Sequence, residues 1–112
     1  MDISGWQSQL RKGAAELVVL AVLQRGELYG LQILETVGGA GGIVSEGALY
    51  PLLNRLERDG KLTSRWSVDA PNVAHPRKYY SLSADGAARL DAMRPAWAEL
   101  SSAINSLVME PS

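Results

Sequence analysis

The side chains that could do chemistry in this chain are mainly cations and hydrogen-bond donors, and they gather in its middle. The stretch between Arg55 and Lys78 has a net charge of +3, whereas the whole chain carries −1. A local cationic stretch of this kind favours a polyanionic partner even when the whole molecule is weakly acidic. The stretch holds six basic residues (Arg55, Arg58, Lys61, Arg65, Arg77 and Lys78) and three acidic ones (Glu57, Asp59 and Asp69).

The sequence offers no residues for catalysis or for metal binding. It has no cysteine and a single histidine, His75, which no cluster of histidines or paired carboxylates accompanies, although a metal site needs several such ligands. No nucleophile motif and no glycine-rich phosphate loop with its lysine is present. We therefore predict no enzyme activity, metal or cofactor. His75 is interpreted as an exposed loop residue, with a phosphate contact as the alternative.

The pattern of apolar residues, glycines and prolines predicts one domain of mostly helical α+β class. Three helices, a hairpin and a final helix in this order (α-α-α-β-β-α) are the plan of a winged helix-turn-helix. Residues 1–83 would form the winged helix-turn-helix and residues 84–112 a C-terminal dimerisation helix. The predicted helices cover about residues 6 or 14 to 24, 29–37, 46–59 and 84–108, and the strands 62–68 and 77–82, with a projecting loop at 69–76.

The third predicted helix has an apolar stripe and an opposite polar face. Leucines at 49, 52, 53 and 56 follow helical spacing, Ser45 precedes them as an N-cap, and Pro51 predicts a kink or a late start. Arginine and asparagine on the other face can read purine edges in a major groove. The cations Arg77 and Lys78 of the predicted hairpin, which is called the wing, can contact phosphates. Each cation alone fits an ordinary solvated surface, but their grouping favours DNA. The contacts predicted from this grouping are Gly47, Tyr50, Asn54, Arg55, Arg58, Arg77 and Lys78.

The last predicted helix carries apolar residues at heptad spacing, which is typical of a helix that pairs with a second copy. The predicted dimerisation residues are Leu90, Met93, Trp97, Leu100, Ile104 and Leu107. Trp97 is interpreted first as dimer packing, and otherwise as a stacking site for a flat aromatic ligand. Pro95 should bend this helix. Trp6 and Trp66 are interpreted as core or dimer contacts, and Leu31 and Leu34, with Ile33 as a further candidate, as the buried side of the second helix.

The apolar run at residues 13–23 follows Arg11 and Lys12 and imitates a signal peptide. Glu16 interrupts this run, which is also far shorter than the ~20 residues that a membrane span needs. We therefore predict a soluble, cytoplasmic protein with no membrane partner.

The chain resembles PadR-type transcriptional regulators over about residues 13–107, and three motifs carry the resemblance. They are EGALYPLLNRLERDGKL at residues 46–62, Leu28-Tyr29-Gly30, and RKYYSLSADG at residues 77–86. The resemblance is to the compact subfamily with one C-terminal helix. It implies a dimeric bacterial regulator, usually a repressor, that a small molecule or stress releases from a near-palindromic operator. By position it implies DNA contacts at Ser45, Gly47, Tyr50, Asn54, Arg55, Arg77 and Lys78.

The resemblance also bears on Trp97, which stands where some compact members hold flat aromatic drugs between tryptophans. Two other classes of function stay open from the residues alone. One is a winged-helix module that binds proteins, and the other is a ligand-sequestering protein without an operator.

Overall fold

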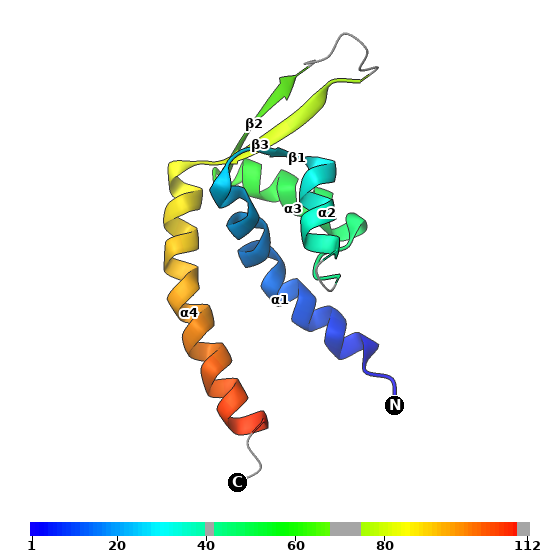
Figure 1. Ribbon diagram of the computed structural model, residues 1–112, viewed down its shortest axis with the longest axis vertical. Helices are drawn as coiled ribbons and strands as arrows, with labels where there is room; N and C mark the ends of the chain where they lie inside the picture. The colour runs from blue at the N-terminus through cyan, green and yellow to red at the C-terminus, as the bar shows by residue number, and fades with distance from the viewer. Residues whose placement is uncertain (40–41, 68–74, 110–112) are drawn as a thin grey trace.

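The computed structural model describes residues 1–39, 42–67 and 75–109. They form α1 (Ser4–Val22), a 3-10 turn η1 (Leu23–Arg25), β1 (Leu28–Tyr29), α2 (Gly30–Gly39), α3 (Glu46–Arg58), β2 (Leu62–Ser67), β3 (Arg77–Leu82) and α4 (Ala84–Val108). The molecule is elongated, 62 × 34 × 21 Å, because the β2–β3 hairpin projects from one end and α4 from the other (Figure 1). Most of the predicted loop 69–76, and Val68 of the first predicted strand, lie outside the described residues.

The predicted winged helix-turn-helix fold, mostly helical and of α+β class, is confirmed. Helices α1, α2 and α3 pack together beside an antiparallel sheet of order β1-β3-β2. The first strand was not predicted, since residue 29 was assigned to a helix. β1 has only two residues, too few to show an alternating pattern, and it is fixed by pairing with β3, Leu28 opposite Tyr80 and Tyr29 opposite Tyr79.

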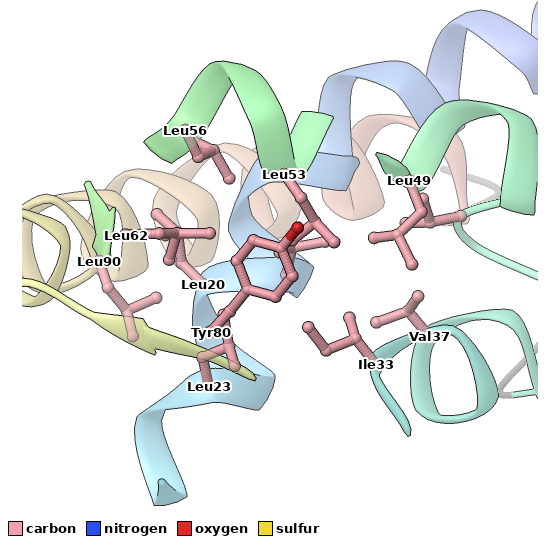
Figure 2. Close-up of a cluster of buried hydrophobic side chains, with 12 residues drawn as sticks. Leu20, Leu23, Ile33, Val37, Leu49, Leu53, Leu56, Leu62, Tyr80 and Leu90 are labelled. Atoms are coloured by element: carbon pink, nitrogen blue, oxygen red, sulfur yellow. The ribbon is translucent and has the colours of Figure 1, made fainter. Parts of the chain in front are cut away.

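One core joins all four long helices and the sheet. Leu49, Leu53 and Leu56 of α3 are buried in it as their spacing predicts. Figure 2 shows the ring of Tyr80 from β3 among leucines and valine or isoleucine side chains contributed by the surrounding helices. On α2 the prediction for Leu31 is wrong: it is exposed, while Ile33 and Val37, four residues apart, are fully buried and Leu34 is partly buried.

The helix ends explain how the elements are placed. α1 begins at Ser4, earlier than either predicted start, and passes through Gly13. It gives way to η1, and Gly26 stops this turn with φ of 146°, a backbone conformation that favours glycine. α3 begins directly after Ser45, whose Oγ accepts a hydrogen bond from the Ala48 N–H at 3.2 Å. The late start predicted from Pro51 is therefore wrong.

α4 is docked tightly at its beginning only. A Cβ on Gly86 would lie 2.0 Å from the Lys61 carbonyl oxygen, so no larger residue fits there without movement of the backbone. Ser83 accepts from the Gly86 N–H at 3.0 Å and donates to the Gly60 carbonyl at 2.6 Å. Arg94 still donates a hydrogen bond to Gln24 of η1. Beyond it the helix continues as one element through Pro95 to Val108 and leaves the body of the molecule (Figure 1).

Candidate nucleic-acid interface

The outer face of α3 carries polar groups that water reaches. Gly47, Asn54 and Arg58 are exposed there, opposite the buried leucines. The Arg58 guanidinium lies 3.8 Å from Asp59 Oδ1, but its side chain is largely exposed. Ser45 is also exposed, although its hydroxyl is occupied by the helix cap. This face therefore offers one amide, one guanidinium and an open stretch of backbone at Gly47.

Tyr50 connects this face to the start of α2. Its ring rests on Gly30: a Cβ at that glycine would come within 2.8 Å of Tyr50 Cε1. The glycine of the Leu28-Tyr29-Gly30 motif therefore allows this close approach, and a larger residue there would have to displace the Tyr50 ring. α2 itself is held at this point by Gln32, whose Oε1 accepts from the Tyr29 N–H at 3.0 Å. The phenol is left partly exposed, 38%, beside the other groups of α3.

The side of the hairpin that carries Arg77 is built from alternating cations and rings. The Arg77 guanidinium carbon lies 4.6 Å from the centroid of the Tyr29 ring. That ring meets Tyr79 edge-on at 5.5 Å, and Arg65 lies 4.6 Å over Tyr79 while it forms an ion pair with Glu27. Arg77 is exposed and has no ion pair with any residue in the described ranges. Stacking on Tyr29 thus directs its charge without neutralising it.

Lys78 lies on the opposite side of the same strand, and its ammonium group is already paired with a carboxylate. Its Nζ donates to Glu57 Oε1 of α3 at 3.0 Å, and Ser64 donates to the same carboxylate. The hydrogen bonds from Ser64 and then Lys78 lower the pKa of Glu57, and the bond to Glu57 raises the pKa of Lys78. The lysine side chain is only 26% exposed. It braces the hairpin on α3.

Arg55, another predicted DNA contact, has its guanidinium beside two carboxylates. It lies 3.2 Å from Glu16 Oε1 of α1 and 3.7 Å from Asp59 Oδ2. Glu16 also pairs with Arg89 of α4, so this carboxylate, 15% exposed, links three helices. Burial alone would raise the pKa of Glu16, but the hydrogen bonds from Arg89 and Arg55 outweigh it and lower that pKa.

The predicted dimerisation residues divide into two groups. Leu90 is 1% exposed, so it offers no surface to a second copy and its assignment to the seam is corrected. Met93 is partly buried against the same core, and its place in the seam stays a prediction. The other four are exposed along the free part of α4: Trp97, Leu100, Ile104 and Leu107. Sequence reasoning missed a second exposed stripe on α1, Ile3, Trp6 and Leu10, of which it had noticed only the tryptophan.

For Trp66 the core alternative is wrong, and the dimer-contact alternative stays a prediction. Trp66 is 66% exposed on β2, opposite Lys78, whose Nζ lies 5.7 Å from its ring. His75 is exposed, as predicted. The described ranges contain no group of three or more potential metal ligands. None of the helices among these residues combines the length and apolar character that crossing a bilayer requires.

The chain resembles known regulators over most of its length. The family model "Transcriptional regulator PadR-like family" matches residues 19–92. A PadR-like transcription factor from Bacteroides fragilis has 36% identity, covers 93% of this chain and 99% of its own, and has a TM-score of 0.73. A PadR family transcriptional regulator from Eggerthella lenta has 31% identity, covers 95% of this chain and 88% of its own, and has a TM-score of 0.77.

A further solved structure, Bacillus subtilis PadR in complex with operator DNA, shares the fold. Its identity is 24% and its TM-score 0.63, with 71% of this chain and 45% of that chain covered. No protein with curated annotation matches the chain.

Proposed function

The chain belongs to the PadR-like family of transcriptional regulators, and from this premise we propose that it binds a near-palindromic operator as a homodimer and acts as a repressor. As a member of that family it is a regulator of transcription and not an enzyme. A regulator of this kind works where the chromosome is, so the proposal includes a cytoplasmic location.

One observation carries the proposal: the exposed face of α3 and the wing cation are anchored on two consecutive residues. Tyr50 of α3 rests on Gly30, and Arg77 of β3 stacks on Tyr29. The groove-reading face and a phosphate-binding charge are therefore held in one fixed relation. Such a relation suits duplex DNA, where a helix in the major groove is flanked by backbone phosphates.

Within this interface the residues take different roles. Asn54 and Arg58 would contact base edges, Gly47 would allow close approach of the backbone, and Tyr50 and Arg77 would contact phosphate or sugar. Ser45, Arg55 and Lys78 stay in the proposal as positioning residues. They cap α3 or attach it to its neighbours through the hydrogen bond to Ala48 and the pairs with Glu16 and Glu57.

The dimer is proposed because two apolar stripes face water in a single copy. The free part of α4 and the first turns of α1 expose large side chains, among them Trp97 and Trp6. Contiguous exposed apolar surface of this kind marks an interface, and a two-fold axis would let each stripe be covered by the partner. Two α3 helices would then enter the DNA about one helical turn, roughly 34 Å, apart.

A released state is part of the proposal through Trp97. Its ring is 49% exposed on α4 next to alanines, and a flat aromatic molecule could stack on it at the centre of a dimer. A protein-binding module, the first alternative, predicts no retention of DNA even at low salt. A ligand-sequestering protein, the second, predicts that planar aromatics quench tryptophan fluorescence without releasing any operator.

The decisive experiment is selection of bound fragments from random duplex DNA, followed by titrations at several salt concentrations. We expect an enriched inverted repeat. If each protomer neutralises about three phosphates, log affinity should fall against log salt with a slope near −5. Arg77→Ala should make that slope shallower by about 2 for the dimer, one phosphate per protomer.

The adjacent lysine provides the matched control. Lys78→Ala removes the same charge from the same strand, yet should change the slope less, because Glu57 already neutralises that lysine. No enrichment of any repeat, together with an Arg77→Ala slope equal to that of the unmodified protein, would refute DNA binding through this face.

A further inference from the structure

A hollow between α1 and the start of α3 has an apolar interior and a cationic rim. Its volume is about 340 Å³, within the range of small-ligand sites. Four residues of α1 line one wall: Ser8, Arg11, Lys12 and Ala15 follow the i, i+3, i+4, i+7 spacing of one helix side. The opposite wall is formed by Gly42, Ile43, Val44, Ser45, Ala48 and Leu52.

The charge at this rim is not balanced. Arg11 and Lys12 are exposed, and neither has an ion pair with another residue in the described part of the chain. None of the described residues that line the hollow is an aspartate or glutamate. Two positive charges beside an apolar interior complement a molecule with one anionic end and one hydrocarbon end.

Two other hollows lack this property. One, lined by residues near η1 and β1, has Arg25 and Glu27 in the same wall. The other is lined by Glu16 and Asp59 together with Arg55, Lys61 and Arg89, and its two carboxylates form ion pairs with Arg55 and Arg89. Charge complementarity therefore selects the hollow at Arg11 and Lys12.

The proposed dimer would not cover this hollow. Ser8 lies two residues after Trp6, which turns it by about 200° around α1. The exposed stripe of Ile3, Trp6 and Leu10 and the lining residues are thus on opposite sides of the helix. A partner copy seated on the stripe leaves the hollow open to solvent.

We propose that this hollow binds a small amphipathic carboxylate, with its head at Arg11 and Lys12 and its apolar body between α1 and α3. The occupant would touch Ser45, Ala48 and Leu52, which include the cap and two turns of α3. Binding would therefore shift the start of α3 and weaken the grip on DNA. This consequence for DNA rests on the proposed function, whereas the binding site does not.

The test uses octanoate and its neutral amide, octanamide, with the full chain and without DNA. A straight aliphatic acid is chosen because it has no ring to stack on Trp97. Amide NMR spectra should show saturable shifts at residues 8–15 and 42–48, with octanamide binding about tenfold more weakly. Arg11→Gln and Lys12→Gln should each weaken octanoate binding about fivefold. Arg25→Gln, which removes an exposed charge elsewhere, should leave it unchanged.

A second variant addresses the apolar part of the site. Ala15→Leu adds three carbons to the lining and should abolish saturation while the circular dichroism spectrum stays that of the folded protein. Shifts confined to the neighbourhood of Trp97, or no saturation by about 10 mM octanoate, would overturn the proposal. So would glutamine variants that weaken DNA binding and leave octanoate affinity intact, because Arg11 and Lys12 would then be phosphate contacts.

The effect of octanoate on DNA binding distinguishes the proposed carboxylate site from the proposed function. Octanoate should lower the affinity of the unmodified protein for its selected operator, and Arg11→Gln should need about five times more octanoate for the same loss of affinity. Octanoate binding by a chain that retains no DNA would support the carboxylate site and refute the proposed binding of an operator.

Discussion

The two ends of α4 have opposite environments although one apolar pattern runs through both. The first turns are fixed: Gly86 touches the Lys61 carbonyl, Leu90 is buried, and Arg89 pairs with Glu16. The last four turns expose Trp97, Leu100, Ile104 and Leu107. The heptad spacing is the same throughout. The point along α4 at which the apolar side chains become exposed is therefore decided by the length of the body that α4 packs on, not by the heptad pattern.

The largest difference between the two ends should appear in a pair of alanine variants. Leu90→Ala removes a fully buried side chain and should lower the free energy of unfolding by about 3 kcal/mol. Leu107→Ala removes an exposed one and should change the stability of a dilute protomer by less than about 0.5 kcal/mol. Urea denaturation at low protein concentration measures both. Equal losses would remove the distinction between a docked and a free part.

Gly86→Ala tests the docked end by adding one carbon. The new Cβ would meet the Lys61 carbonyl at 2.0 Å, and the necessary backbone shift should cost about 2 kcal/mol. The matched control is Ala88→Ser at an exposed position of the same helix, with an expected loss of about 0.5 kcal/mol. A Gly86→Ala protein with an unchanged thermal midpoint would show that α4 is not held against the α3–β2 turn.

Leu100→Glu tests the free end through the oligomeric state. A carboxylate inside an apolar helix pair is costly, so the variant should be monomeric at concentrations where the unmodified protein is dimeric. Light scattering coupled to size-exclusion chromatography gives the mass. Ser102→Glu places the same charge about 200° around the helix and should stay dimeric. Identical masses for all three proteins would refute pairing through the exposed stripe.

Glu16→Gln should have the smallest effect and a distinctive pH dependence. The folded pKa of Glu16 is lowered from its ordinary 4.5, so its contribution to stability is present above that pH and is lost as the pH falls through the folded pKa. We expect the variant to lose about 1 kcal/mol at pH 7 and progressively less below about pH 4.5. A loss that did not depend on pH would point to packing rather than charge.

Much of the architecture could be predicted from local patterns. Ser45 and Ser83 cap helices where a hydroxyl precedes apolar spacing, and the hairpin strands alternate as a half-buried sheet requires. The errors arose where a residue's environment comes from a distant segment. Leu31 and Ile33 of α2 are both apolar, and only packing against the rest of the core decides which one is buried.

The candidate site shows the same division. The local net charge of the sequence grouped Arg55, Arg77 and Lys78 as one cationic surface. A count of charges does not show which of these side chains forms an ion pair within the protein. Glu16 lies 39 residues before Arg55, and Glu57 lies 21 residues before Lys78. Adjacent residues on β3 point to opposite sides. Lys78 therefore reaches Glu57 and forms an ion pair, whereas Arg77 has no ion pair with any described residue. The motif glycines at 30 and 86 were visible, but the ring and the carbonyl that lie against them were not.

The stacking of Arg77 on Tyr29 has a consequence for how the protein would release DNA. Tyr29 immediately precedes α2, and its backbone pairs with β3. The Arg77 guanidinium that stacks on this ring should therefore move together with the helix-turn-helix. In the proposed complex the contact of Arg77 with phosphate and the insertion of α3 into the major groove would therefore be lost at the same time. Dissociation should then be a single step without a partly attached intermediate, and a modest displacement of one helix would suffice to free the operator.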